Sequence, residues 1–158
     1  MKILAVQNRM GIGDTVIFLP FIKALSKKYS SPISILVKEN TKAEQFLYET
    51  DYIDKILLLE RDRNNNNHGG FFGTFKLINY IKEYKFDKIF IFNSSLRFYL
   101  IAKLCGIPEI FQYPLLNKID QHIIDTPKKF FKDKLNIHVN DDPEIQINNS
   151  IVSQTITK

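Results

Sequence analysis

Two glycines and a carboxylate stand together after a short apolar run, in the stretch NRMGIGDT. Gly11 and Gly13 have the spacing that opens the dinucleotide-binding fingerprint, and Glu39 stands where a ribose-binding acid would follow. Val16 replaces the third small residue of that fingerprint, and Asp14 would place a negative charge beside an incoming pyrophosphate. The stretch therefore disfavours the binding of NAD or FAD.

A structural interpretation of the same stretch needs no ligand. Gly11 and Gly13 would then permit a tight turn from a strand into a helix. Asp14 would cap that helix, because a carboxylate can accept hydrogen bonds from backbone N–H groups at the positive end of the helix dipole.

The elements that would position this stretch alternate between strands and helices. Short apolar runs bounded by polar or glycine-containing segments predict buried strands at 3–6, 33–37, 56–59, 88–92 and 109–112. Apolar residues at intervals of three and four predict helices between these strands and after the last one. This order is typical of an α/β Rossmann-like domain, in which a parallel sheet carries helices on both faces and ligands bind at the carboxyl ends of the strands.

The sequence also predicts where the first helix begins, which residues cap the later helices and which residues face inward. The first helix should cover 17–29 and begin near Leu19 or bend there, because Pro20 lacks an N–H group. Short polar side chains are the predicted caps of later helices: Thr41, Ser94 or Ser95, and Thr126. The predicted inward-facing residues are Phe75, Ile78 and Ile81, then Leu100, Ile101 and Leu104, then Phe130, Phe131 and Leu135.

The composition limits the partners without naming them. The 158-residue chain has 22 Lys and Arg against 17 Asp and Glu, a formal charge of +5, which favours anionic partners. The lone Cys105 excludes an intrachain disulfide and suits a reducing compartment, and the wide spacing of His68, His122 and His138 predicts no metal site. No run approaches the about 20 apolar residues of a membrane span, and the apolar run at the start is too short for a signal peptide.

The pattern weakens toward the end of the chain. Residues 1–147 are expected to form one Rossmann-like domain, and residues 148–158 a linker or a disordered tail, because this segment is polar and unpatterned. The asparagine-rich segment 61–70 is expected to be a surface loop.

Several short motifs follow one another in the order of one enzyme family. Gly13 and Asp14 form a GD pair after the first strand, Pro20 lies in the following helix, and YIDKI at 52–56 leads into the third strand. The segment FDKIFIFNSSLRFYLIAKLCG at 86–106 matches a later family segment. Through these motifs, over roughly the first 140 residues, the chain resembles the ADP-heptose:lipopolysaccharide heptosyltransferases of glycosyltransferase family 9.

The resemblance implies the N-terminal half of a GT-B glycosyltransferase, in which two Rossmann-like domains face each other across a cleft. This chain would supply the acceptor side, and the C-terminal, donor-binding domain would be absent from it. The resemblance assigns Asp14 as the catalytic base that takes the proton of the acceptor hydroxyl in an inverting transfer. Neither a metal nor a cofactor is expected.

Acceptor binding is expected at basic and small residues of the strand ends: Arg9, Gly11, Gly13, Arg61, Arg63 and Arg97. Guanidinium groups suit an anionic, phosphorylated glycolipid. Arg61 and Arg63 could equally be solvated loop residues, and Arg97 could instead bind a backbone carbonyl or Asp87. His122 is expected to be an interface histidine rather than a catalyst.

The expected function is an inverting, heptosyltransferase-like transfer in bacterial lipopolysaccharide biosynthesis. The donor would be a nucleotide sugar such as ADP-heptose, and the acceptor a lipopolysaccharide-core or related glycan. Without the donor-binding domain the chain would be an inactive fragment. Two alternatives stay open: a non-catalytic Rossmann-like binding module, and a nucleotide-dependent oxidoreductase.

The expected location is the cytoplasm, with peripheral contact to the inner membrane and no nucleic-acid partner. The basic stretch at 128–134 could bind the surface of an anionic membrane. Core phenylalanines beside solvated lysines explain this stretch better.

Overall fold

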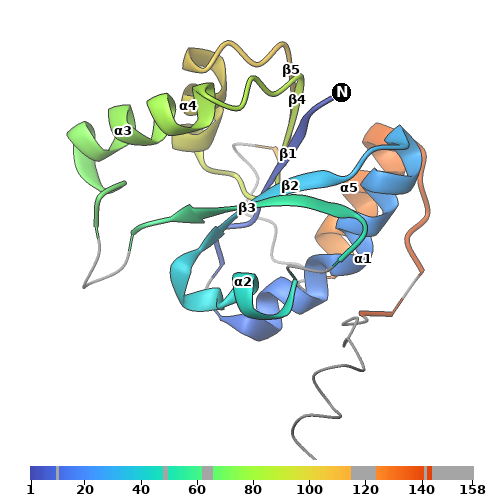
Figure 1. Ribbon diagram of the computed structural model, residues 1–158. Helices are drawn as coiled ribbons and strands as arrows, with labels where there is room; N and C mark the ends of the chain where they lie inside the picture. The colour runs from blue at the N-terminus through green and yellow to red at the C-terminus, as the bar shows by residue number, and fades with distance from the viewer. Residues whose placement is uncertain (10, 48–49, 62–65, 115–123, 141, 144–158) are drawn as a thin grey trace, which may run out of the picture.

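A five-stranded parallel sheet, in the order β3-β2-β1-β4-β5, forms the centre of the molecule (Figure 1). The computed structural model describes residues 1–9, 11–47, 50–61, 66–114, 124–140 and 142–143. The strands are β1 (Ile3–Val6), β2 (Ile33–Lys38), β3 (Ile53–Leu59), β4 (Lys88–Ile91) and β5 (Glu109–Gln112). The third strand begins earlier than the sequence predicts, because its register with β2 starts at the pair Ile33 and Ile53.

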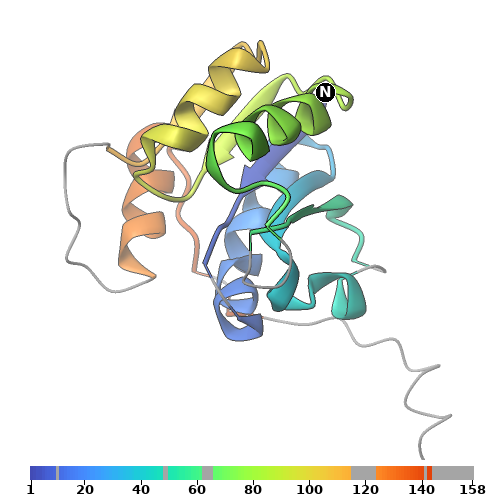
Figure 2. The ribbon, with the colours of Figure 1, turned by 90° about the vertical axis from the view of Figure 1, so that its left-hand side faces the viewer.

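Helices cover both faces of this sheet (Figures 1 and 2). On one face α1 (Ile12–Tyr29), α2 (Ala43–Phe46) and α5 (Asp125–Leu135) share a core with the side chains of Ile3, Ile35 and Phe90. On the other face α3 (Gly70–Lys82) and α4 (Leu96–Leu104) pack against Leu4 and Ile91. The predicted α/β Rossmann-like sheet with helices on both faces is therefore confirmed.

The first helix is longer than the sequence predicts. It begins at Ile12 rather than near Leu19, and Pro20 lies inside it without ending it. Phe18, Leu19, Pro20, Phe21 and Ile22 are all buried around the proline. Burial of these apolar side chains offsets the about 3 kcal/mol that an interior proline costs a helix.

None of the predicted caps donates or accepts a side-chain cap hydrogen bond in the described helices. Thr41 ends a 3-10 turn, Glu39–Thr41, and its hydroxyl donates to the Lys38 carbonyl at 2.6 Å. Ser95 precedes α4 without a side-chain cap bond. α5 begins at Asp125, so Thr126 and Pro127 lie inside its first turn rather than before it.

The inward faces are only partly as predicted. Ile78, Ile81, Ile101, Phe130, Phe131 and Leu135 are buried. The prediction is wrong for three residues, Phe75, Leu100 and Leu104, because each is about half exposed. The burial of Phe130 and Phe131 also confirms that the stretch at 128–134 contributes to the core.

Candidate functional site

The loops that leave β1 and β4 meet at the carboxyl edge of the sheet. The side-chain amide of Asn93 donates to Asn8 Oδ1 at 3.2 Å. These two strands are neighbours, yet β1 leads to α1 on one face of the sheet and β4 leads to α4 on the other. Such a reversal opens a crevice outside the strand ends, which is where parallel α/β sheets bind ligands.

Gln7 fixes the shape of the loop between β1 and α1. Its side-chain Nε2 donates to the Asp14 carbonyl at 3.3 Å, and its Oε1 accepts from the Arg9 backbone N–H at 2.6 Å. Gln7 is buried, with 4% of its surface exposed. The sequence analysis missed this role, although a glutamine directly after an apolar strand was a visible signal for it.

Asp14 is the third residue of α1, and it does not cap the helix. The residue that precedes the helix is Gly11, and no side-chain cap bond forms there. Among the described residues, no group forms a hydrogen bond or ion pair with the Asp14 carboxylate. The side chain is half-buried. These observations contradict the cap interpretation and leave both carboxylate oxygens available to a ligand.

The two glycines of the loop have different physical roles. Gly11 has a φ of 102°, a conformation that side chains with a Cβ rarely adopt. Gly13 lies inside the helix, where any residue fits the backbone, and no atom lies within 4 Å of the place where its Cβ would stand. The surface over Gly13, which precedes Asp14 in the helix, is therefore open.

Arg9 lies on the same loop and is exposed. It acts on Tyr113, which follows β5: burial raises the pKa of the Tyr113 hydroxyl, and the positive charge of Arg9 opposes that rise. The effect indicates that Arg9 lies in the neighbourhood of the β5 end. Arg9, Gly11, Gly13 and Asp14 are therefore brought to one edge of the sheet.

The side-chain amide of Gln112 joins the carboxyl end of β5 to the loop that follows β4. Gln112 Nε2 donates to the carbonyls of Asn93 and Ser95, at 3.0 and 2.9 Å, and the Ser95 N–H donates to Asn93 Oδ1 at 2.9 Å. Gln112 Oε1 is buried and has no hydrogen-bond partner among the described residues. This amide network holds the β4–α4 loop in place beside the β1–α1 loop.

Arg97 is turned toward α3, on the face of the sheet opposite α1. Its Nε donates to Thr74 Oγ1 at 3.2 Å, and its Nη2 donates to the carbonyl of His68. Its Nη1 is buried without a hydrogen-bond partner in the described part of the chain. Burial and the nearby charge of Arg61 lower the pKa of Arg97. Of the two alternatives expected for Arg97, it binds a backbone carbonyl.

The other predicted residues lie farther from Asp14 or outside the described chain. Arg61 is exposed and follows β3, which β2 separates from β1, so its strand lies about 10 Å away in the sheet. Arg63 and His122 lie outside the described residues. No group of three His, Cys, Asp or Glu in the described ranges could hold a metal ion.

His68 organises the start of α3 in a way that the sequence analysis did not foresee. Its Nδ1 accepts the backbone N–H of Glu60 at 3.0 Å, and its own backbone N–H donates to the Glu60 carbonyl at 2.9 Å. Its ring stacks on Tyr80 at 5.8 Å. Burial lowers the pKa of His68, while the charge of Glu60 acts in the opposite direction.

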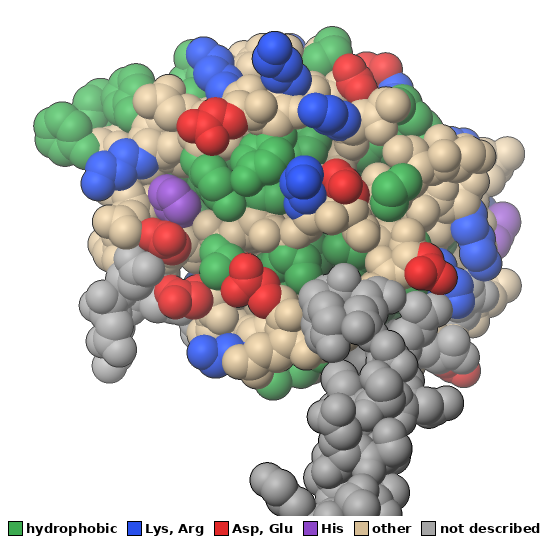
Figure 3. All heavy atoms as spheres, in the orientation of Figure 1, with side chains coloured by type: hydrophobic (Ala, Val, Ile, Leu, Met, Phe, Trp, Pro, Cys, Tyr) green, Lys and Arg blue, Asp and Glu red, His purple; other side chains and the backbone are tan. Residues whose placement is uncertain are grey.

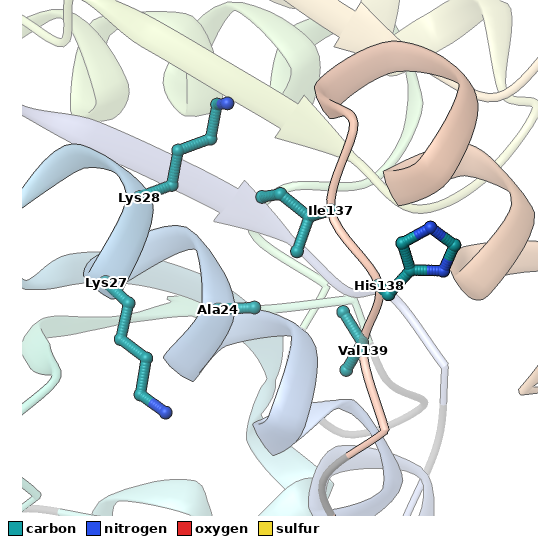
Figure 4. A pocket seen from close by; sticks show the side chains of 6 residues that line it. All are labelled: Ala24, Lys27, Lys28, Ile137, His138 and Val139. Atoms are coloured by element: carbon teal, nitrogen blue, oxygen red, sulfur yellow. The ribbon is translucent and has the colours of Figure 1, made fainter.

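Two hollows lined by described residues lie away from Asp14. One, of about 410 Å³, lies between Ala24, Lys27 and Lys28 of α1 and the segment 137–139 (Figure 4). Ala24 is about 15 Å along the helix from Asp14. The second, of about 330 Å³, lies near Cys105 at the opposite end of the strands. Neither hollow belongs to the loops that carry the predicted site.

Known proteins match this chain by structure and not by sequence. No family model matches the sequence, and no curated protein sequence matches it. The structure matches the glycosyl transferase family 9 protein from Veillonella parvula DSM 2008 with a TM-score of 0.74 and 18% identity, over 98% of this chain and 48% of that one. The fold is shared with glycosyltransferases of family 9.

Other solved structures of this kind match over similar lengths. E. coli ADP-heptose lps heptosyltransferase II gives a TM-score of 0.62 and 16% identity, over 98% of this chain and 49% of that one. E. coli heptosyltransferase WaaC with ADP-2-deoxy-2-fluoro heptose gives 0.57 and 13%, over 100% of this chain and 55% of that one. The chain spans about half the length of these proteins, as expected for one half of a GT-B fold.

Proposed function

We propose that this chain is the acceptor side of an inverting, nucleotide-sugar-dependent glycosyltransferase, with Asp14 as its general base. The observation that carries the proposal is the position of the Asp14 carboxylate. It has no partner in the described part of the chain, and it follows a loop at the edge of the sheet where parallel α/β folds bind ligands. The fold shared with family 9 glycosyltransferases supports the assignment.

The reaction needs a base because a neutral sugar hydroxyl is a weak nucleophile. Asp14 would take the hydroxyl proton as the acceptor oxygen forms its bond to the anomeric carbon of the donor. The bond from that carbon to the diphosphate oxygen breaks at the same time, with inversion of configuration. Gln7 would hold the backbone of Asp14 in place during this step.

The donor would bind to a second domain that faces this carboxyl edge. The solved structures that match this chain are about twice its length, and the matching structure of WaaC is a complex with ADP-2-deoxy-2-fluoro heptose. We therefore propose ADP-heptose or a similar nucleotide sugar as donor. We also propose that the chain is inactive until a donor-binding domain is joined to it.

The acceptor would be an anionic glycan or glycolipid of the lipopolysaccharide-core type, used at the cytoplasmic face of the inner membrane. Arg9 is exposed on the β1–α1 loop and Arg61 is exposed after β3, so both can reach a phosphate group. We assign Arg63 to the same role by its place in the sequence. Arg97 would contribute by holding the start of α3, where its hydrogen bonds already are.

A binding experiment on the chain itself tests the acceptor assignment. Titration with a phosphorylated lipopolysaccharide-core oligosaccharide should shift backbone amide NMR signals of residues 7–14 and 93–97. Arg9→Gln should weaken this binding by about tenfold, because a desolvated charge-assisted contact is lost. Calorimetry with NAD separates the oxidoreductase alternative: tight binding of NAD at the same loop would contradict the proposal.

A further inference from the structure

The outer faces of α3 and α4 expose more large apolar side chains than any other described part of the chain. Six residues form this α3–α4 outer face, and each is between 49% and 82% exposed: Phe71, Phe72, Phe75, Leu96, Leu100 and Leu104. Large exposed apolar side chains that gather on one part of a folded domain mark an interaction site. The sequence analysis placed Phe75, Leu100 and Leu104 in the core, so this surface is a finding of the structure.

The six side chains lie on the exposed sides of two neighbouring helices. The leucines recur at intervals of four residues along α4, and the rings of Phe71 and Phe75 pack against each other at 5.0 Å. Arg97 of α4 donates to Thr74 of α3, which holds the first turns of the two helices side by side (Figures 1 and 2). Hydrophobic side chains project from the molecule where α3 begins (Figure 3).

The charges on these helices have one sign. α3 and α4 contain no Asp or Glu, and they contain Lys76, Lys82, Arg97 and Lys103. The three lysines are exposed. In contrast α5, which is also rich in lysine, contains Asp125 and Asp133. The exposed Glu83 follows α3 directly and lies outside the helix. An apolar face on helices whose own charges are all positive is complementary to a surface that is apolar inside and anionic outside.

We propose that the α3–α4 outer face binds the surface of an anionic lipid bilayer. The phenylalanines and leucines would enter the boundary between head groups and acyl chains, and the lysines would contact the anionic head groups. A second copy of the chain fits this face poorly, because pairing two such faces would bring like charges together. The proposal goes beyond the proposed function, since binding to a bilayer requires neither Asp14 nor a sugar donor.

The orientation has a consequence for the candidate site. Both α3 and α4 begin at the carboxyl edge of the sheet, so a bilayer beneath their first turns lies beside the loops that carry Asp14 and Arg9. An acceptor anchored in that bilayer could then present its sugar to Asp14 without leaving the membrane. This consequence rests on the proposed function, whereas the binding itself does not.

Co-sedimentation of the chain with lipid vesicles tests the proposal. The chain should bind vesicles of phosphatidylcholine mixed with phosphatidylglycerol, bind pure phosphatidylcholine vesicles at least tenfold more weakly, and lose affinity as salt is added. The variant Phe71→Ser/Phe72→Ser/Phe75→Ser should bind the mixed vesicles at least tenfold more weakly, because its insertion surface is removed. Circular dichroism should show the same melting temperature, since these side chains are exposed.

A matched pair of charge variants separates this face from the rest of the basic surface. Lys76→Gln/Lys103→Gln should weaken binding by about 25-fold, because each of the two cations near an anionic bilayer contributes roughly fivefold. Lys128→Gln/Lys132→Gln, which lowers the net charge equally on α5, should bind nearly as the wild type does. Asp14→Asn should bind vesicles as the wild type does. Vesicle binding therefore tests this proposal independently of the catalytic role proposed for Asp14.

Three outcomes would overturn the proposal. One is the absence of binding to the mixed vesicles at low salt. Another is equal loss of binding in the α5 pair and in the α3–α4 pair. The third is a dimer in analytical ultracentrifugation that the three serine substitutions dissociate, because the face would then join two copies of the chain.

Discussion

Gly13 and Asp14 are adjacent, and the chemistry proposed for the carboxylate depends on the empty space beside the glycine. No atom lies within 4 Å of a Cβ placed on Gly13, and its backbone is helical. Gly13→Ala should therefore not destabilise the fold, and it should raise the free energy of unfolding by up to about 1 kcal/mol. The added methyl group would nevertheless occupy the path of the acceptor.

We predict that Gly13→Ala weakens oligosaccharide binding at least tenfold in the NMR titration while thermal unfolding shifts to the same or a higher temperature. Gly11→Ala is the control for backbone effects, because alanine at the φ of 102° and ψ of 157° of this position should cost about 1–3 kcal/mol of stability. Unchanged binding by Gly13→Ala would show that the acceptor does not approach along this side of the helix.

The same loop shows what a sequence can reveal about a site. The GD pair and the strand before it were visible because they are local. The hydrogen bonds of Gln7 and the pairing of Asn8 with Asn93 were not, since they join residues whose contact depends on the whole loop or on the order of the strands. Arg97 was predicted at the acceptor site, but its partners come from α3, which lies far from it in the sequence.

At the scale of elements, the connection from β3 to α3 depends on a neutral histidine. His68 Nδ1 accepts the Glu60 N–H, and a protonated ring would lose that acceptor. Burial lowers the pKa of His68 below its ordinary value of 6.5. The unfolded chain therefore binds a proton more readily than the folded one does. Stability from this group is complete above about pH 6.5 and is lost as the pH falls.

We predict that unfolding by urea requires less denaturant at about pH 5.5 than at about pH 7.5, and that His68→Asn removes most of this difference. The asparagine carbonyl oxygen can replace Nδ1 as acceptor, but it does not titrate. Glu60, Arg97 and Lys76 act on the same ring and stay in place in this variant. An equal pH dependence in wild type and variant would assign the effect to other groups.

The strands and α4 show why the fold was easier to predict than the faces of its helices. Runs such as 3–6 are apolar throughout and can only be buried, so their pattern predicts a parallel sheet. α4 has apolar residues on several sides, with Phe98 and Ile101 inward and Leu100 outward. Periodicity alone cannot distinguish an apolar side that meets the sheet from one that meets a membrane or another partner.

At the scale of the whole molecule, the described residues form a five-stranded sheet with helices on both faces, and the chain is about half as long as the family 9 structure that it matches. Within the described residues, no helix has the length and apolarity to cross a bilayer. The membrane contact that we propose is made by the outer face of α3 and α4.

The central claim is that Asp14 acts as a base in sugar transfer. Its most direct test is the rate of transfer by this chain fused to the half of the Veillonella parvula protein that it does not cover, with an ADP-sugar donor and a phosphorylated core oligosaccharide. The fusion should transfer sugar with inversion. Asp14→Asn should lower kcat by about 10²–10⁴ while the melting temperature stays unchanged, because the carboxylate has no structural partner in the described chain. Transfer by Asp14→Asn at the wild-type rate, or a fusion that folds and binds both substrates without transferring sugar, would contradict the account.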